Sequence, residues 1–215
     1  HSGKEGGATL GAATSVDGGA TFGNPVVAAS VSCVCCQPSG FFAGGAPAIA
    51  FRGLVAESAE WDVRDISVVR AQAGAWSGPT TVHDDGFEVN ACVSVGPGLA
   101  VGDDGAVHAV WWTGATGRAG YWYARSTDGV AFSEPVRVAE QAVAPNENNP
   151  PVALGPDGSV FTATVAHGMY DAEGNELADP NGVELWRIRD GDVERVDAAV
   201  RGGFPQLAAT GDGAV

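Results

Sequence analysis

Short apolar runs separated by Asp/Gly turns recur along the chain. The run Gly98–Val101 is followed, after two Asp residues, by a second run at Gly105–Trp111. The same order occurs at Pro151–Leu154 and Gly158–Thr164, and a fainter copy begins at Gly45. Apolar runs of about 4–8 residues bounded by turn signals predict strands, and Gly supplies the positive φ of a tight hairpin. The pattern therefore predicts pairs of antiparallel strands, and no long stretch has the period of a helix.

A second repeated unit, a Ser-x-Asp turn followed by an aromatic residue and a proline, lies between these strand pairs. It occurs at Ser15–Phe22 and Ser126–Phe132, and a degenerate copy occurs at Ala73–Trp76. The aromatic residues stand at positions 22, 76 and 132, at intervals of 54 and 56 residues. The glycines of the strand pairs stand at positions 45, 105, 158 and 213, at intervals of 60, 53 and 55 residues. Two markers with one period predict the four-stranded blades of a β-propeller.

The predicted fold is all-β, a β-propeller of four-stranded antiparallel blades in a single domain over residues 1–215. The phase of the repeat gives a half blade at 8–30, blades at 31–83, 92–139 and 151–198, and a second half blade at 204–215. These pieces either close as a four-bladed ring or form a segment of a longer, six-bladed one. An end in mid-strand would leave an unpaired edge, so we favour the segment.

Composition narrows the classes of partner. The net charge is −15, and the chain has one lysine. Phosphate groups would repel such a surface, which argues against nucleic acid and against anionic membrane surfaces. No apolar run approaches the ~18 residues of a membrane span, so we expect no transmembrane segment. An acidic surface with few lysines is a common way for a protein to stay soluble outside the cell.

The turns at Asp17 and Asp128 resemble Asp-boxes, the turn motif of sialidase-like, BNR-repeat β-propellers. The first copy matches every position, with Phe as the aromatic residue, and the second lacks one residue. The Asp accepts hydrogen bonds from its own turn while the aromatic residue packs between sheets. The resemblance implies turns on the rim, away from the axis where sialidases act. We therefore assign a structural role to Ser15, Asp17, Gly19, Phe22, Ser126, Asp128 and Phe132.

A closer resemblance is to secreted bacterial sialidase-like proteins of uncharacterised function. It is carried by Cys33-Val34-Cys35-Cys36, Arg64-Asp65-Ile66, His83-Asp84-Asp85-Gly86, and Cys92 before Gly96-Pro97. The resemblance covers roughly residues 8–168 and is more specific for fold than for activity. It implies a secreted or periplasmic protein.

The four cysteines allow three disulfide pairings. Cys36 and Cys92 each precede a predicted inner strand, so we expect them to pair near the axis while Cys33 and Cys35 close a small ring. A structural role suits a secreted protein. The alternative is a thiolate metal site at Cys33, Cys35, Cys36 and Cys92, with His83 as a further ligand. Gln37 follows the C-x-x-C where covalent haem attachment needs His, and we expect no cofactor.

A sialidase-type hydrolase would need an arginine cluster for the substrate carboxylate, a nucleophilic Tyr activated by Glu, and an Asp acid/base. Arg52 lies on a predicted inner strand in a segment that faintly resembles the family's Phe/Tyr-Arg-Ile-Pro motif. Arg64 opens the next strand beside Asp65. Either arginine faces the central channel or forms a salt bridge with a nearby carboxylate. Arg52, Arg64 and Asp65 are thus the catalytic candidates, but no Tyr–Glu pair emerges from the sequence, and we lean towards a protein that is not an enzyme.

Two polar loops are candidate binding sites. His83, Asp84 and Asp85 follow an outer strand where propellers often bind ligands, and they suit either a cation or sugar hydroxyl, or a solvated turn. Asn146 and Asn148 lie in a connection bounded by prolines. The sequence favours a binding or scaffolding module that engages a glycan or a protein subunit of a larger assembly. The alternative is an exo-acting sialidase-type glycoside hydrolase, in which Arg52 or Arg64 binds an anionic sugar.

Overall fold

The computed structural model of the chain describes residues 7–57, 62–91, 93–145, 149–167, 181–201 and 205–209. All the regular secondary structure in these residues is β-strand, and neighbouring strands pair antiparallel. The predicted all-β class is therefore confirmed. In the described part of the chain, no helix is long and apolar enough to cross a bilayer.

The described residues of the N-terminal half form three sheets. The first sheet pairs β1 (Ala8–Ala12) with β2 (Val26–Ser32). The second has the order β3-β4-β7-β8, with β9 also paired to β7. Its strands are β3 (Ser39–Ala43), β4 (Ala46–Arg52), β7 (Ile66–Gln72), β8 (Ala75–Trp76) and β9 (Thr80–Thr81). The connections that flank the second sheet contribute a small sheet of β5 (Ala56–Glu57), β6 (Asp62–Val63) and β10 (Glu88–Val89).

Two regular four-stranded sheets follow, each a meander in chain order. The third sheet consists of β11 (Gly98–Val101), β12 (Val107–Thr113), β13 (Gly120–Ser126) and β14 (Val136–Glu140). The fourth sheet consists of β15 (Val152–Leu154), β16 (Val160–His167), β17 (Asn181–Arg189) and β18 (Asp192–Arg201).

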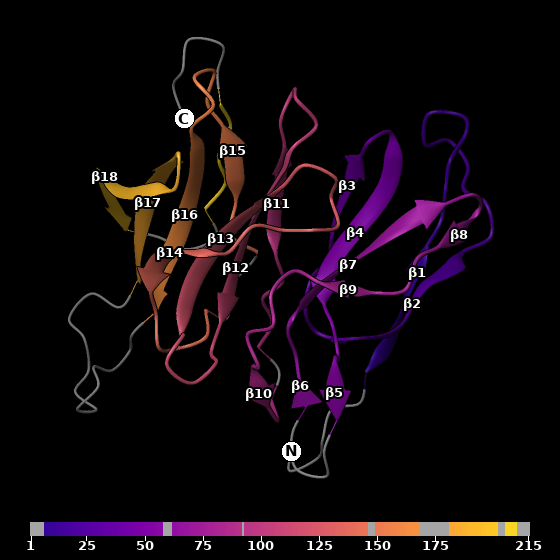
Figure 1. The fold of residues 1–215 in the computed structure, drawn as a ribbon, viewed down its shortest axis with the longest axis horizontal. Coiled ribbons are helices and arrows are strands. Elements are labelled where there is room, and N and C mark those ends of the chain that lie inside the picture. The colour runs from indigo at the N-terminus through magenta and orange to yellow at the C-terminus, as the bar shows by residue number, and fades with distance from the viewer. Residues whose placement is uncertain are drawn as a thin grey trace.

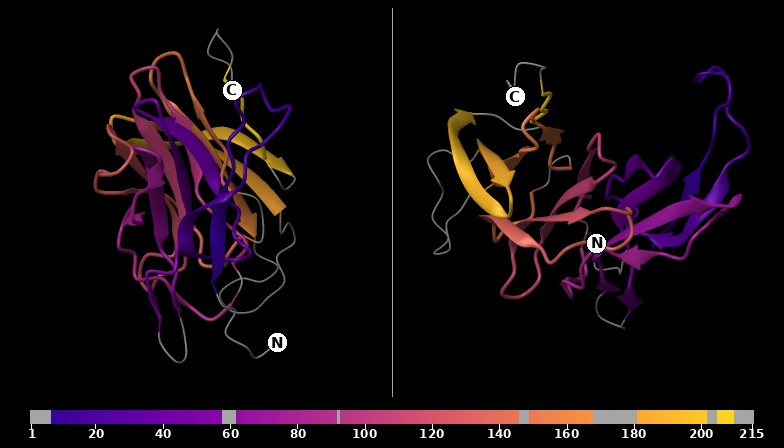
Figure 2. Two further views of the ribbon diagram at one scale, coloured as in Figure 1. Left: turned by 90° about the vertical axis from the view of Figure 1, so that its right-hand side faces the viewer. Right: turned by 45° about the horizontal axis from the view of Figure 1, so that its top comes forward.

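The sheets stand side by side in chain order. Figure 1 shows them from β1 and β2 on the right to the fourth sheet on the left, and the right-hand view of Figure 2 shows the same succession. The first strands of successive sheets meet, because β11 lies against both β3 and β15. Four-stranded antiparallel sheets that meet through their first strands are the blades of a β-propeller. The number of blades in a complete ring stays a prediction, and the predicted half blade at 204–215 lies mostly outside the described residues.

The predicted hairpin glycines have the backbone conformation that the turns require. Gly105 joins β11 to β12 with φ 78°, and Gly158 joins β15 to β16 with φ 80°. A side chain is strained in this left-handed region, whereas Gly is not. The recurring Asp/Gly signal in the sequence therefore marks the sharp reversals between the first two strands of a blade.

The described residues form a core that lies between the sheets and is divided into three clusters. One lies between β1–β2 and the second sheet and includes Ala29, Phe51 and Val69. The next lies between the second and third sheets around Trp111. The third lies between the third and fourth sheets and reaches Trp112 and Val95. Trp111 and Trp112, which are adjacent on β12, thus pack on opposite faces of one sheet, as the two-residue period of a strand requires.

The turns at Asp17 and Asp128 are held by hydrogen bonds within the turn. Asp17 accepts from the Thr21 amide at 2.9 Å and from the Thr21 hydroxyl at 2.6 Å. Asp128 accepts from the amides of Val130 and Ala131 at 2.8 and 2.9 Å. These donors favour the ionised carboxylate, lowering the pKa of Asp17 to about 2 and that of Asp128 below its usual value. Both Asp side chains are occupied in shaping their turns.

The aromatic residues of the two turns have different surroundings. Phe132 packs against the core between the second and third sheets. Phe22 is 65% exposed, so the expectation that it packs between sheets is wrong. Phe22 lies in the connection between β1 and β2, outside both strands, and does not belong to the core cluster that these strands form with the second sheet.

Candidate functional site

Antiparallel pairing places alternate connections at opposite ends of the blades. One end, which we call the charged end, gathers the connections β2–β3, β4–β7, β9–β11 and β12–β13. The other, the hairpin end, gathers the connections β11–β12, β13–β14, β15–β16 and β17–β18. The charged end contains the catalytic candidates from the sequence. It also contains the candidate binding residues His83, Asp84 and Asp85 and the Cys33–Cys36 segment.

Arg52, at the end of β4, is fully buried and joins three segments. Its Nε donates to the carbonyl of Val95 at 2.9 Å, its Nη1 to that of Arg64 at 2.8 Å, and its Nη2 to that of Trp112 at 2.7 Å. The guanidinium also lies over the Phe87 ring, 5.5 Å from its centroid. Burial lowers the pKa of Arg52 to about 10, so the side chain stays charged at neutral pH. All three guanidinium nitrogens are bound to backbone carbonyls.

Arg64 and Asp65 are equally buried. Arg64 pairs with Asp62 at 3.2 Å, and its Nη1 lies 3.3 Å from the carbonyl oxygen of Ala91. The sequence analysis allowed for a salt bridge between Arg64 and a nearby carboxylate. In the structure the partner is Asp62. Asp65 accepts the amides of Gly86 and Phe87 at 3.0 Å each. Burial raises the pKa of Asp65.

Asp85 is the centre of a second buried group. One oxygen accepts the indole N–H of Trp111 at 2.7 Å. The other lies 2.9 Å from Nδ1 of His83 and 3.2 Å from Nε of Arg118. Arg118 in turn stacks on Trp122, 4.0 Å from the ring centroid. Asp85 therefore fastens the β9–β11 connection to the third sheet, while Asp84 beside it is exposed.

These contacts show how the candidate residues of the charged end are used. Arg52, Arg64 and Asp65 bind backbone groups or an internal carboxylate, and Asp85 binds Trp111 and its neighbours. Asn146 and Asn148 lie outside the described residues. Asn149, which the sequence did not single out, accepts the Gly96 amide at 2.7 Å and donates to the Gln37 carbonyl at 2.9 Å. It thereby ties together the connections that lead into three successive blades.

The cysteine pairing differs from the expectation. A disulfide joins Cys33 to Cys36, whose Cα atoms are 5.4 Å apart across one turn. The expected pairing of Cys36 with Cys92, and of Cys33 with Cys35, is therefore wrong. The turn between β2 and β3 folds Cys36 back over Cys33, a local closure that the expectation did not consider because it rested on blade positions. Cys92 lies outside the described residues.

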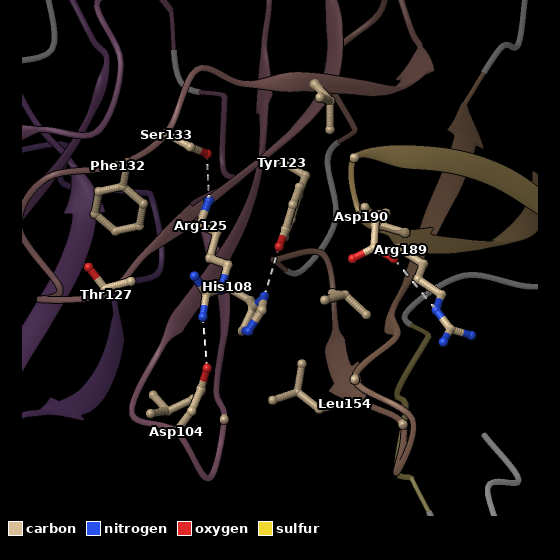
Figure 3. A pocket seen from close by; sticks show the side chains of 18 of the residues that line it. Asp104, His108, Tyr123, Arg125, Thr127, Phe132, Ser133, Leu154, Arg189 and Asp190 are labelled. Carbon is tan, nitrogen blue, oxygen red and sulfur yellow. Dashed lines mark hydrogen bonds and ion pairs between the residues drawn. The ribbon is translucent and has the colours of Figure 1, made fainter.

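The hairpin end contains a cleft of about 1060 Å³ between the third and fourth sheets, which we call the interblade cleft. Figure 3 shows His108 and Tyr123 near its centre, with Asp104 and Arg125 to one side and Arg189 and Asp190 to the other. Its apolar lining includes Phe132, Val136, Leu154, Val160 and Ile188. Pockets that hold small ligands have volumes of roughly 300–1,000 Å³, so this cleft has room for one.

The polar groups of the cleft are organised by contacts across the third sheet. Nδ1 of His108 and the hydroxyl of Tyr123 are 2.8 Å apart, and their rings are stacked with centroids 6.0 Å apart. Arg125 pairs with Asp104 at 2.7 Å. Burial lowers the pKa of His108 and raises that of Tyr123, so both are neutral at neutral pH. Across the cleft, Arg189 pairs with Asp157 at 3.1 Å.

Sequence reasoning did not find this cleft. None of the polar residues that line the cleft is among the candidates of the sequence analysis. The usable signal was polar residues on otherwise apolar strands, since His108 stands near the start of β12 and lies opposite Arg125 in the register. Nothing in the sequence indicates that the third and fourth sheets separate at this end.

The His108 pKa predicts a pH dependence of stability. In the unfolded chain His108 has a pKa near 6.5, and in the fold its pKa is lower. As the pH falls below about 6.5, the unfolded state binds a proton that the folded state does not, so the free energy of unfolding decreases. His108→Gln removes this contribution, and we expect urea midpoints at pH 7.5 and 5.5 to differ less for the variant than for the unchanged protein. If the midpoints shift equally with pH in the variant and in the unchanged protein, His108 is not buried in its neutral form.

Comparisons with known proteins agree on the fold. No family model matches the chain, and no curated protein is similar to it. Among solved structures, a protein of unknown function from Dyadobacter fermentans is 16% identical over 83% of this chain and 59% of its own, with a TM-score of 0.50. An α-L-arabinanase from Penicillium chrysogenum with bound arabinobiose is 13% identical over 92% of this chain and 62% of its own, with a TM-score of 0.54. An α-L-arabinofuranosidase from Fusarium graminearum is 13% identical over 95% of this chain and 59% of its own, with a TM-score of 0.51.

These likenesses show the fold. The chain spans about three fifths of the length of the structures that it matches. Together with the antiparallel four-stranded sheets, they show that the chain has the fold of a β-propeller.

Proposed function

We propose that this protein is a secreted or periplasmic β-propeller of the sialidase-like, Asp-box type that acts as a binding module, on its own or as an accessory subunit of a larger assembly. The ligand that we propose is a glycan, held in the interblade cleft. The observation that carries the proposal is the cleft itself, with its volume of about 1060 Å³ and its mixed lining. The Cys33–Cys36 disulfide is compatible with a location outside the cytoplasm.

The lining of the cleft suits a sugar. A sugar ring presents hydroxyl groups at its edge and C–H groups on its faces, so its site needs both hydrogen-bonding and apolar groups. The hydroxyl of Tyr123, the imidazole of His108 and the guanidinium of Arg189 offer the former. Phe132 and Leu154 offer the latter. Ligand hydroxyls can donate to the carboxylates and accept from the arginines.

The charge of the lining favours a neutral sugar over an anionic one. Among the described residues, four carboxylates and two guanidinium groups line the cleft, and His108 is neutral there at neutral pH. The lining residues are Asp103, Asp104, Glu134 and Asp190 against Arg125 and Arg189. This excess of negative charge has the same sign as the net charge of the whole chain, −15, and it would repel the carboxylate of a sialic acid.

The alternative function, an exo-acting sialidase-type glycoside hydrolase, finds less support in the described residues. In such an enzyme Arg52 or Arg64 would bind the substrate carboxylate. In the structure, however, all three guanidinium nitrogens of Arg52 donate hydrogen bonds to backbone carbonyls, and Arg64 pairs with Asp62. Two of the similar structures are glycoside hydrolases that act on arabinose-containing sugars, which by itself supports only the shared fold. The binding module is therefore the function that we favour.

The experiment combines a glycan array with titration calorimetry. The array carries neutral pentose and hexose oligosaccharides, among them arabinobiose, together with sialylated glycans. We expect binding to a neutral glycan and none to the sialylated ones. Arg189→Ala removes a donor from the cleft wall and is expected to weaken the binding of the best neutral glycan about tenfold, the value of one charged hydrogen bond.

Arg195→Ala is the matched control. Arg195 is, like Arg189, an exposed arginine of the fourth sheet in an ion pair, with Glu184 at 2.8 Å, and it does not line the cleft. Its replacement should leave the affinity unchanged. Absence of glycan binding by the folded protein would overturn the proposal. An equal loss of affinity in both variants would show that the glycan does not bind in the cleft. Release of a monosaccharide from any array glycan would favour the hydrolase instead.

A further inference from the structure

The positive groups that line the interblade cleft are already paired with carboxylates. Arg125 of the third sheet forms an ion pair with Asp104 at 2.7 Å, and Arg189 of the fourth sheet forms one with Asp157 at 3.1 Å. Each guanidinium group of the lining thus has a carboxylate beside it that offsets its charge. In the part of the cleft that the structure describes, a ligand meets no uncompensated positive charge.

Three further carboxylates of the lining are paired weakly or not at all. Asp103 lies in the β11–β12 hairpin and Glu134 in the connection β13–β14, and neither takes part in an ion pair among the described residues. Asp190, in the β17–β18 turn on the opposite wall, lies 3.9 Å from Nε of Arg189, which is a long separation for an ion pair. Both walls of the cleft therefore carry uncompensated negative charge.

His108 contributes an uncharged polar group at the centre of the cleft. Its side chain is 8% exposed, and its Nδ1 lies 2.8 Å from the hydroxyl of Tyr123. Nε2 has no hydrogen-bond partner among the described residues, and Figure 3 shows the ring between the Arg125–Asp104 pair and Leu154. Burial, followed by the charge of Arg125, lowers the pKa of His108, so the imidazole stays neutral at neutral pH and does not repel a cation.

We propose that the interblade cleft takes an amino sugar with its amine in the ammonium form, in preference to the N-acetylated or hydroxyl counterpart of the same sugar. This inference rests on the proposed function and names the class of glycan. The ammonium group donates to the carboxylates of Asp103, Glu134 or Asp190, which are ligand-facing acceptors. The net charge of −15 of the chain attracts the same sign of ligand at longer range.

The apolar part of the lining favours a sugar over a small amine. Phe132 and Leu154 line the cleft and suit the C–H faces of a sugar ring. The cleft volume of about 1060 Å³ is also far more than an ammonium group alone would fill. A linear diamine would use the carboxylates and leave the rest of the cleft unoccupied.

The test is titration calorimetry with three disaccharides that share one β-1,4-linked skeleton. They are the disaccharide of glucosamine, its N-acetylated form, and cellobiose. At pH 7.0 we expect the glucosamine disaccharide to bind about tenfold more tightly than the other two, the value of one charged hydrogen bond. A sugar amine has a pKa roughly like that of an α-amino group, about 7.7–8.0, so the advantage should disappear at pH 9.0.

The protein groups at the centre of the cleft do not titrate over this interval. The pKa of His108 is lowered and that of Tyr123 is raised, so both stay neutral from pH 7.0 to pH 9.0. The change in preference with pH therefore reports the charge of the ligand. Raising the salt concentration should weaken the binding of the glucosamine disaccharide and leave that of the N-acetylated form unchanged, because salt screens exposed charges.

Two matched variants locate the charge. Glu134→Gln removes a carboxylate of the lining while keeping its shape, and it should weaken the binding of the glucosamine disaccharide roughly threefold without affecting the N-acetylated form. Glu140→Gln is the control. Glu140 is an exposed glutamate of β14 whose nearest cation is Arg137, at 4.0 Å, and it does not line the cleft. Its replacement should leave both affinities unchanged.

The outcomes separate this inference from the proposed function. Equal affinity for the three disaccharides, or binding of a neutral array glycan but not of the glucosamine disaccharide, would overturn the preference for an ammonium group and leave the binding module standing. Absence of binding to every glycan would overturn both. Binding of 1,4-diaminobutane as tight as that of the glucosamine disaccharide would show that the cleft recognises charge alone, and would overturn the assignment to a sugar.

Discussion

Replacement of Arg52 by Ala is expected to lower the free energy of unfolding by about 3–5 kcal/mol, the largest effect of any substitution considered for this chain. Arg52 donates to the carbonyls of Val95, Arg64 and Trp112, which belong to three different segments of the charged end. Truncation leaves these buried carbonyls without their donor and opens a cavity beside Phe87. Arg52→Lys should recover little of the loss, because one compact ammonium cannot reproduce a planar fork that reaches three carbonyls.

Urea denaturation measures this effect, and Arg195→Ala provides the comparison. Arg195 is 62% exposed and forms a single surface ion pair, so its loss should change the free energy of unfolding by less than about 1 kcal/mol. The outcome also bears on function. A stable Arg52→Ala protein that had lost glycan binding or turnover would make Arg52 a ligand-binding residue and would restore the hydrolase interpretation.

The strands and turns were predictable because their signals are local. The pairs Asp104-Gly105 and Asp157-Gly158 identify hairpins from neighbouring residues alone. The positive φ values at both glycines confirm these hairpins. The apolar runs on either side of each hairpin became β11, β12, β15 and β16. A period of about 54 residues then identified the blade as the repeated unit, because repeated signals reinforce one another.

The roles of the charged residues were not predictable in the same way. Whether Arg52 binds a ligand or a carbonyl depends on Val95 and Trp112, which are 43 and 60 residues away in the sequence. Asp85 likewise meets Trp111 only because the β9–β11 connection folds back over the third sheet. Alternation along a strand tells which face a side chain occupies, but not which distant backbone group it meets.

The interblade cleft depends on the relative placement of two sheets, which no sequence motif encodes. Its lining comes from four connections and the strand ends beside them, from Val101 to Gly191. Each lining residue, taken alone, resembles an ordinary rim or packing residue. The Cys33–Cys36 disulfide was missed for the opposite reason, because the closure is so local that an argument from blade positions looked past it.

Replacement of Gly98 by Ala is expected to lower the free energy of unfolding by about 2–3 kcal/mol through a clash between blades. Gly98 begins β11, the first strand of the third sheet, and it is buried. A Cβ at this position would overlap the carbonyl oxygen of Pro150 and lie 3.2 Å from Cγ2 of Val152. The overlap is with backbone, so relief requires the third and fourth sheets to move apart rather than one side chain to rotate. Urea denaturation of the variant measures the loss.

Gly40→Ala tests whether the loss comes from the close approach of the blades or from removal of a glycine in a first strand. Gly40 lies on β3, the first strand of the second sheet, and a Cβ there would meet no heavy atom within 4 Å. Its replacement should change the free energy of unfolding by less than about 0.5 kcal/mol. Because Gly98 and Asn149 both lie where the fourth sheet approaches the third, Gly98→Ala should also loosen the bond from the Gly96 amide to Asn149 and speed amide exchange at Gly96. Equal stability losses in the two variants would show that the first strands of neighbouring blades do not pack as closely as the structure indicates.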